Sequence, residues 1–296
     1  MAINYAEKYS AKIDERFKLG AFTAGAVNNS YDFIGVQSIK IYSVPTAAMG
    51  NYTLSGTSRY GTPAELENSV QEMVMSQDRA FTFTIDRRNY SDTMMINAAG
   101  SALQRQIYEV IIPELDTYRL SKMCAATGIQ SAKGTLSKSN AYEALLDAGV
   151  ALTEKKVPLA GRMAFVTPTF YKLIKQDDSF IKKGDMAQSI AIKGVVGEVD
   201  GVPLIQIPSS YLPTGVNFIV TNKEATIAPT KLAEYKIHDN PPGINGWLVE
   251  GRIYYDAFIL NNKAAAIYVH KTESTTPSQG DQSQNTPSGD EQSQNG

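Results

Sequence analysis

Apolar and polar positions change their spacing several times along the first half of the chain, and each spacing predicts a different element. Residues 3–19 place apolar side chains near the helical period, which predicts a helical N-terminal arm. Residues 39–44 and 81–85 alternate between apolar and polar side chains, which predicts short strands. Residues 94–127 carry an apolar stripe at 3.6-residue spacing, which predicts a rod-like helix of about 45 Å.

The long predicted helix contains a proline, Pro113. Proline lacks a backbone donor, but the apolar pattern resumes at once, so we expect Pro113 to bend the rod rather than end it. Ser91 or Asp92 is expected to cap its start, and Gly128 is expected to follow its end.

From residue 140 onward, predicted helices and strands alternate, which indicates the α+β class. Asn140 and Glu143 resemble a capping box, and Thr167 before Pro168 predicts another helix start. Asp200-Gly201 predicts a tight turn between two strands. The predicted elements are a helix over 140–156, a strand over 162–166, a helix from 168, two strands within 195–207, and strands over 218–220, 251–260 and 264–269, the last two joined by a turn at 261–263.

The connection from Pro45 to Ala80 is 36 residues long, far beyond the usual loop length. A free linker would not carry so many apolar side chains, and an isolated two-stranded ribbon is marginally stable in water. We expect this segment, and the N-terminal arm with it, to rest on another subunit; folding back on the chain's own body is the alternative. The apolar side chains are Tyr52, Leu54, Tyr60, Leu66, Val70, Met73, Val74 and Met75.

Residues 273–296 contain no aliphatic or aromatic side chain and form two ten-residue repeats that are identical at seven positions. Such a segment cannot bury enough apolar area to offset its chain entropy, so we expect a disordered tail. It is either a solvated tail or a partner-binding one. The tail holds four acids and no base, which leaves 28 basic and 26 acidic side chains in the rest of the chain.

Composition excludes several classes of protein. The 296 residues are 43% hydrophobic and 20% charged, as in ordinary globular proteins, and no apolar run approaches the roughly 20 residues that span a bilayer. The single cysteine, Cys124, excludes an internal disulfide. A net charge of −2 provides no bulk attraction to nucleic acid.

The residues that carry chemistry do not form a catalytic pattern. No Gly-Lys dipeptide is present, so a P-loop is absent. Cys124 is expected to be a packing residue, and His238 and His270 to be surface or turn residues without zinc-ligand spacing. Asp177-Asp178 lies in a loop-like stretch. Glu114 and Asp116 are two residues apart on a predicted helix, so their side chains do not converge, and we expect them on a solvated or intersubunit face. We therefore predict no catalytic, cofactor or metal site.

The order of an arm, a long ribbon, a bent rod-like helix and an α+β unit resembles the major capsid proteins of tailed bacteriophages, which have the Hong Kong 97-type fold. The residues most similar to that family are 112–120, 162–173, 197–205 and 251–269. The resemblance implies an α+β fold with an N-terminal arm, an extended β-ribbon loop, a peripheral domain with a long spine helix, and an axial domain. The implied divisions are 1–35 for the arm, 36–85 for the extended loop and flanking strands, 86–135 for the peripheral domain, 136–235 for the axial domain, 236–272 for return strands, and 273–296 for the tail.

The resemblance also implies a function that needs no active site. Such proteins assemble as hexamers and pentamers into an icosahedral shell around double-stranded DNA, which they contact without sequence specificity. The implied partners are a portal protein and a scaffold. Because few residues precede the first strand, either a separate scaffold protein assists or the chain is a processed form, and Met1 favours the separate scaffold. The implied location is the virion capsid, assembled in the bacterial cytoplasm. The alternatives are an encapsulin-type nanocompartment around a cargo enzyme, and a small-oligomer hydrolase or binding module that uses Asp177-Asp178 or His238.

Charged and aromatic residues on the ribbon and the long helix are the candidates for contact between subunits. Arg87 and Arg88 could also contact phosphate, but an isolated arginine pair is weak evidence for nucleic-acid binding. The candidate contact residues are Arg59, Tyr60, Arg87, Arg88, Glu114, Asp116 and Arg119.

Some relatives cross-link their shells through a lysine on the extended loop and an asparagine on a neighbour. Residues 41–80 contain no lysine, so we predict shells without an isopeptide bond at the loop. Purified shells boiled in denaturant should migrate as single chains on a gel, and a covalent ladder would contradict the prediction.

Overall fold

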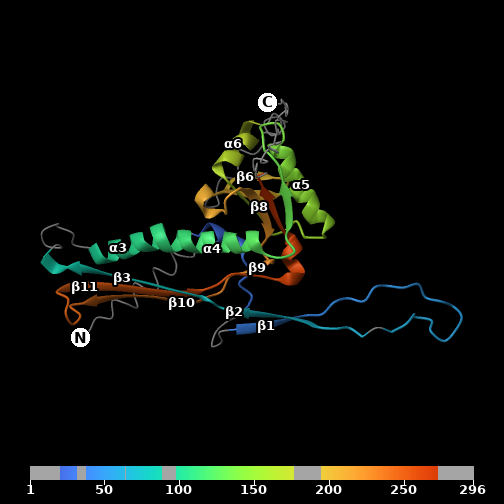
Figure 1. Cartoon of the computed structure of the whole chain (residues 1–296), viewed down its shortest axis with the longest axis horizontal. Coiled ribbons are helices and arrows are strands. Elements are labelled where there is room, and N and C mark those ends of the chain that lie inside the picture. The colour runs from blue at the N-terminus through green and yellow to red at the C-terminus, as the bar shows by residue number, and fades with distance from the viewer. Residues whose placement is uncertain (1–20, 32–37, 64, 89–97, 177–194, 273–296) are drawn as a thin grey trace, which may run out of the picture.

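The structure, a computed structural model, describes residues 21–31, 38–63, 65–88, 98–176 and 195–272. They form an elongated body, a compact body above one end of it, and a long projection that points away from the elongated body (Figure 1). Both helices and sheets are present throughout, so the predicted α+β class is confirmed. The predicted arm helix, the acidic pair Asp177-Asp178 and the repeat tail lie outside the described residues.

The elongated body is a three-stranded antiparallel sheet with a long helical rod on one face (Figure 1). Leu103, Ile107 and Leu115 of the rod pack on Val249 and Ile253 of the sheet. The strands lie in the order β10 (Thr230–Asp239), β11 (Gly246–Tyr255) and β3 (Gln77–Asp86), and the rod consists of α3 (Ala98–Gln106), the π-helical turn η2 (Ile107–Ile111) and α4 (Ile112–Ala125).

The rod continues through Pro113, as predicted. The π-helical turn ends directly before α4, and Pro113 lies in the first turn of α4, where a missing backbone donor is tolerated best. The helix ends at Ala125, and Gly128 follows with a φ of 84°, which fits the predicted stop. The predicted caps Ser91 and Asp92 lie outside the described residues.

Two predicted strands in the elongated body have wrong bounds, and a third strand was missed. The strand predicted over 251–260 is β11, which runs from Gly246 to Tyr255, because residues 246–250 also pair with β3. β3 begins at Gln77 rather than Phe81, because Gln77 to Ala80 pair with residues 252–255 of β11. β10 was not predicted, yet it pairs along its length with β11. The predicted domain boundary between residues 235 and 236 therefore falls inside a strand.

The compact body is a six-stranded mixed sheet with helices α5 and α6 on one face and the end of α4 on the other. Phe170, Phe218 and Leu145 belong to the core on the α5 side, while Leu120 and Phe165 belong to the core on the α4 side. The strand order is β4 (Gln130–Lys133), β13 (Ile267–Lys271), β8 (Val216–Asn222), β5 (Arg162–Val166), β7 (Val202–Gln206) and β6 (Val195–Val199); the helices are α5 (Ala141–Glu154), α6 (Pro168–Gln176) and the short η3 (Ser209–Tyr211).

Local signals in the compact body are largely confirmed. Strand 162–166 has the predicted bounds, and Thr167 Oγ1 accepts a hydrogen bond from Phe170 N at the start of α6. The β6–β7 turn lies at Asp200-Gly201, as predicted. Asn140 precedes α5 but does not cap it through its side chain, which accepts from Ser137 N instead.

The last strand, β13, begins at Ile267 rather than at residue 264. Residues 261–266 form a 3₁₀ helix, η4 (Asn261–Ala266), instead of the predicted three-residue turn. Gln130 Nε2 on β4 donates to Ala265 O in this helix, so η4 is held by a neighbouring strand that the sequence analysis did not predict.

The projection is a two-stranded antiparallel ribbon formed by β1 (Ser38–Ser43), β2 (Ser69–Val74) and the residues 44–68 between them. We call it the ribbon. At its base lies a small sheet of β9 (Thr226–Ile227) and β12 (Phe258–Ile259). Strand β1 confirms the alternation seen at residues 39–44, whereas β2 was not predicted.

Gly251 lies at the centre of the elongated sheet, between Phe81 and Tyr235 on the neighbouring strands. The two rings approach each other at 6.1 Å, and a Cβ on Gly251 would lie 2.2 Å from Phe81 Cε1. The absence of a side chain at residue 251 therefore allows both rings to close over the strand beneath the rod.

We expect Gly251→Ala to lower the free energy of unfolding by about 1–3 kcal/mol, because the added methyl overpacks the core. Urea denaturation of the unassembled subunit measures this loss. Gly197→Ala is the matched control, since a Cβ there meets nothing within 4 Å; equal effects of the two substitutions would contradict the packing argument.

Candidate functional site

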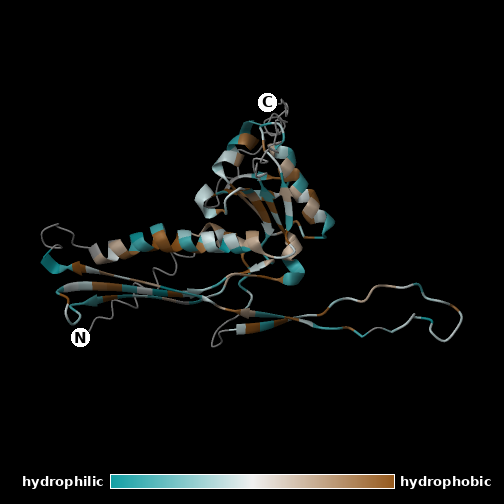
Figure 2. Ribbon diagram, viewed as in Figure 1, coloured by the Kyte–Doolittle hydropathy of each residue, from teal (hydrophilic) through white to brown (hydrophobic). Residues whose placement is uncertain are grey.

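The ribbon exposes apolar side chains on its outer face and along its distal part. Ile39, Ile41 and Met73 face the protein's own body, whereas Tyr42 and Val70, which lie opposite each other in register, remain 67% and 50% exposed. Figure 2 shows apolar stretches along the ribbon, far from both bodies. In its distal part Met49, Leu54 and Tyr60 are 86–100% exposed.

Folding back on the chain's own body and contact with another subunit therefore apply to different parts of the ribbon. Its base folds back on the protein's own body, because Met73 and Met75 are buried with Ile227 and Leu260. Residues 44–63 and 65–70 are exposed. For this distal part, contact with another subunit stays a prediction.

Two polar residues fix the direction in which the ribbon leaves the body. Gln71 donates from Nε2 to Ile259 O at 2.8 Å and accepts from Asn261 N at 3.0 Å. Asp256, which is buried, accepts from Ser76 N at 2.8 Å and from the Tyr118 hydroxyl at 2.7 Å. Burial, reinforced by Asp256, raises the pKa of Tyr118 to about 12, so the hydroxyl remains a donor. These contacts join the ribbon, the rod and β12.

Residues 21–28, which we call the strap, lie against both bodies. Ala21 packs in the core of the elongated body, whereas Ala26 and Val27 are buried in the compact body. Asn28 N donates to Thr226 O at 2.7 Å beside the ribbon base. The strap includes the short 3₁₀ helix η1 (Phe22–Ala26) and therefore connects three parts of the fold.

Asp116 of the rod holds the strap. Its carboxylate accepts hydrogen bonds from Phe22 N at 2.9 Å, Thr23 N at 3.2 Å and Thr23 Oγ1 at 2.6 Å. Arg119 donates from Nη1 to the same Thr23 hydroxyl at 3.2 Å. Burial raises the pKa of the Asp116 carboxyl, while the hydrogen bonds from Thr23 and Phe22 and the charge of Arg119 oppose that rise.

The prediction that Asp116 and Arg119 contact a neighbouring subunit is wrong. The two residues are 0% and 6% exposed, so their charges are used inside the chain. A charged helix position was interpreted as surface, because the sequence does not show that the strap covers it.

The other candidate contact residues lie on the surface in three separate places. Arg59 and Tyr60 lie in the distal ribbon, where the Tyr60 ring is 5.0 Å from that of Tyr52. Arg87 binds Asp239 at 3.2 Å and lies over the Trp247 ring, and Arg88 N donates to Asp86. Glu114 binds Arg79 at 2.7 Å on the rod. The fold does not bring these groups together into one site.

Groups that could perform catalysis are placed unfavourably for it. Cys124 is buried, and burial raises its thiol pKa to about 12, which fits the predicted packing role. His238 is exposed on β10, 3.1 Å from Glu250. His270 corrects the prediction of a surface residue: it is buried, stacks on Phe218, and its Nδ1 lies 3.2 Å from the Asn217 amide. Burial lowers the pKa of His270, so the neutral ring is favoured.

Two further findings apply to the described part of the chain. It contains no group of three or more His, Cys, Asp or Glu side chains placed to hold a metal ion. None of its helices combines the length and the apolar character needed to cross a membrane.

The comparisons with known proteins agree with this geometry. The family described as Phage capsid protein matches residues 71–269, more than half of the chain. The chain belongs to the phage capsid protein family. Comparison with the curated proteins finds no match.

Solved structures show the capsid fold at low sequence identity. The capsid of cyanophage P-SCSP1u is 13% identical, with a TM-score of 0.63 over 83% of this chain and 85% of that one. The mature capsid of bacteriophage PhiM1 is 10% identical, with a TM-score of 0.64 over 86% and 87%. The virus-like particle of Pyrococcus furiosus is 14% identical, with a TM-score of 0.58 over 91% and 100%. These likenesses confirm the expected α+β capsid fold.

This phage capsid protein is thus a structural protein of the virion shell. Several residues that set the shape of its subunit were missed in the sequence. Asp256 lies within a predicted strand, Gln71 within the long connection and Thr23 within a run of small residues. None of the three carries a local signal that distinguishes it from a solvated polar residue.

We expect Asp116→Ala to lower the free energy of unfolding of the capsid subunit by about 3–5 kcal/mol, because it leaves the strap donors and Arg119 buried without their partner. Urea denaturation tests this, and hydrogen exchange should show faster exchange at the amides of Phe22 and Thr23. Glu109→Ala on the exposed side of the rod should leave the midpoint almost unchanged. An Asp116→Ala variant as stable as wild type would contradict the conclusion that Asp116 stabilises the subunit by holding the strap.

Proposed function

We propose that this chain is the major capsid protein that assembles as hexamers and pentamers into an icosahedral shell around double-stranded phage DNA. The proposal depends on the ribbon, which exposes large apolar side chains that a neighbouring subunit would cover. Burial of apolar area contributes about 25 cal/mol per Å², so many modest contacts stabilise a closed shell. A portal protein, a separate scaffold protein and assembly in the host bacterial cytoplasm belong to the same proposal.

Charge supports a shell that confines DNA without reading its sequence. Outside the tail the chain carries 28 basic and 26 acidic side chains. Specific or tight nucleic-acid binding normally requires a concentrated basic surface, because phosphate contacts dominate affinity. The DNA is therefore proposed to be held by enclosure.

Five of the candidate contact residues remain in this proposal. Arg59 and Tyr60 would contact a neighbour through the ribbon, Arg87 and Arg88 through the end of β3, and Glu114 through the rod. Arg87 and Glu114 already form ion pairs within the chain. A charged residue of a neighbouring subunit would therefore add to an existing ion pair.

A nanocompartment shell around a cargo enzyme is the second candidate, favoured by the likeness to the virus-like particle of Pyrococcus furiosus. The fold serves both functions equally well. Neighbouring genes distinguish them: portal and terminase genes support the phage shell, whereas a gene for a cargo enzyme supports the compartment.

Expression of the wild-type chain together with the proposed scaffold protein should produce closed particles that negative-stain microscopy and size-exclusion chromatography detect. We expect the triple variant Met49→Ser, Leu54→Ser, Leu66→Ser to fold but to lower the particle yield at least tenfold, because the ribbon loses its apolar contacts in every copy. Asn51→Ser, Ser55→Ala, Ser58→Ala changes the same ribbon without removing apolar area and serves as the control. A small wild-type oligomer, or normal particles from the first triple variant, would contradict the proposal.

A further inference from the structure

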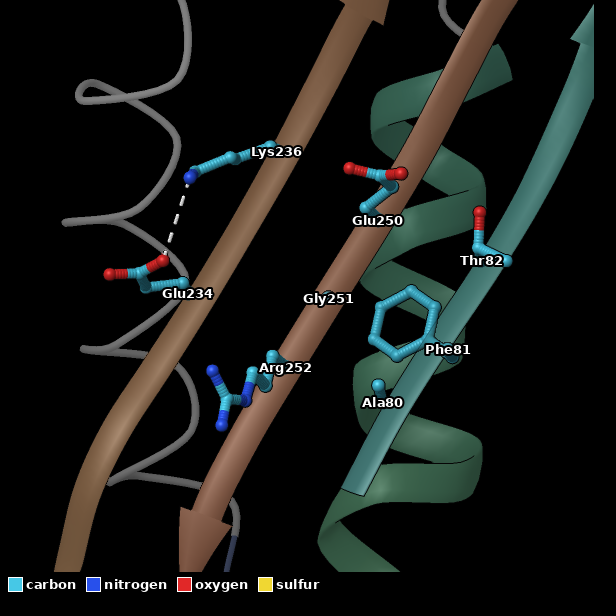
Figure 3. A pocket seen from close by; sticks show the side chains of 8 residues that line it. All are labelled: Ala80, Phe81, Thr82, Glu234, Lys236, Glu250, Gly251 and Arg252. Atoms are coloured by element: carbon cyan, nitrogen blue, oxygen red, sulfur yellow. Dashed lines mark ion pairs between the residues drawn. The ribbon is translucent and has the colours of Figure 1, made fainter. Parts of the chain in front are cut away.

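Strand β3 forms one edge of the elongated sheet, because the strands lie in the order β10, β11 and β3. An open pocket of about 430 Å³ lies on the face of this sheet that turns away from the rod, and Figure 3 shows β3 along one side of it. The long charged side chains around the pocket come from β10 and β11, whereas Ala80 and Thr82 on β3 are short. Over these residues no long side chain of β3 shields its backbone on this face.

One side of the β3 backbone bonds to β11, and the other side is open. Arg87 N donates to Asn245 O at 2.9 Å, so the odd-numbered residues of β3 are the ones that bond to β11. Backbone groups alternate in direction along an antiparallel strand, so those of the even-numbered residues point away from β11. These residues are exposed, and the described part of the chain places no backbone hydrogen bond on their outward side: Asp78, Ala80, Thr82, Thr84 and Asp86.

This open edge lacks the features that keep free strands apart. Natural proteins protect a free edge with charges, prolines, bulges or very short strands. β3 is ten residues long and pairs with β11 without a register shift, and residues 80–85, Ala-Phe-Thr-Phe-Thr-Ile, contain no charge, glycine or proline. Aromatic and β-branched residues in such a run favour pairing with another strand. We therefore expect the edge of β3 to have a partner strand in the assembled protein.

We infer that β3 pairs antiparallel with β3 of a second copy of this chain, across a two-fold axis at Phe83. Two three-stranded sheets then join into one sheet of six strands. In this register Phe83 lies opposite Phe83 and Thr82 lies opposite Thr84, and the outward backbone groups of the two strands bond to each other. This inference rests on the proposed function and adds a contact in which both copies use the same surface.

Charge selects this register among those that the backbone allows. An axis at Thr82 would place Asp78 of each copy opposite Asp86 of the other, and like charges directly opposite each other are destabilising. An axis at Phe83 places Asp86 opposite Ala80 instead. An axis nearer the start of β3 would set its charged residues against the uncharged stretch, and an axis further along would leave the start of that stretch unpaired, because β3 ends at Asp86.

The same register brings apolar side chains together on the rod face. Phe81 and Phe83 pack against the core beneath the rod, with their rings stacked 6.2 Å apart, and both remain only partly buried. Across the axis Phe83 meets Phe83, and Phe81 meets Ile85 of the other copy. Aromatic and β-branched residues directly opposite each other stabilise antiparallel pairs. The pairing would therefore extend the apolar core of each elongated body into that of its neighbour.

Charges placed at the centre of the contact test it. Thr82→Lys with Thr84→Lys should lower the particle yield at least tenfold, because lysines then face each other on both sides of the axis. Thr82→Lys with Thr84→Glu is the matched control. It should recover at least half of the wild-type yield, since each lysine then faces a glutamate of the other copy. Both threonines are exposed in the subunit, so both variants should fold, and circular dichroism of the unassembled chains checks this.

Disulfide trapping measures the register directly. Thr82→Cys with Thr84→Cys should give covalent dimers on oxidation, seen on a non-reducing gel, because residues directly opposite each other in a sheet lie within disulfide reach. Thr82→Cys alone and Thr84→Cys alone are the controls. Each single cysteine lies diagonal to its copy across the axis, so both controls should migrate as monomers. The native Cys124 is buried.

The outcomes separate this inference from the proposed function. If wild-type particles form and the double-lysine variant assembles normally, or if the folded lysine–glutamate variant fails as well, β3 does not pair with itself and the inference is wrong. Dimers from a single-cysteine variant, or none from the double-cysteine variant, would also overturn it. If the wild-type chain forms no particles, the proposed function fails, and oxidation of the concentrated double-cysteine subunit still decides whether β3 pairs with itself.

Discussion

The subunit depends on a buried polar contact where its two bodies meet. The buried side of α4 changes core at this point: Ile112 and Leu115 belong to the elongated body, and Leu120 and Met123 to the compact body. Between them lie Asp116 and Arg119, both buried and both bonded to Thr23 of the strap. Apolar contacts alone would tolerate many relative positions of two cores, whereas hydrogen bonds to a buried carboxylate favour one.

The directions of the ribbon and of the elongated sheet are defined relative to this contact. The ribbon begins beside it and is directed by Gln71 and Asp256, so a long, largely exposed element has a defined starting direction. The elongated sheet extends in the opposite direction (Figure 1). A protein that works by assembly needs this combination, because accurate geometry must come from the subunit while much of the burial comes from neighbours.

Elements with strong local signals could be predicted from the sequence. Strand 162–166, the helix start at Thr167 and the turn at Asp200-Gly201 depend on residues close in the chain, and the structure reproduces them. The long rod could be predicted despite Pro113, because its apolar stripe resumes directly. The family resemblance depended on the order of such elements and was correct for the same reason.

Features that depend on distant residues could not be predicted. Asp116 looked like a surface charge because its partner Thr23 lies 93 residues away. β10 alternates from Ala233 to His238 and could have been recognised, but the start of β3 at Gln77 is visible only through its pairing with β11. The sheet-face pocket requires three strands from distant parts of the sequence, so no motif could indicate it.

The opposite directions of ribbon and sheet have a consequence for how copies join. The proposed contact between the ribbon of one copy and a different surface of the next copy is head-to-tail, so an open row of copies keeps one unsatisfied surface of each kind at its ends. Only a closed ring satisfies all of them, and a row that fails to curve continues as a filament. The tilt between successive copies, rather than the strength of any one contact, therefore decides whether growth stops.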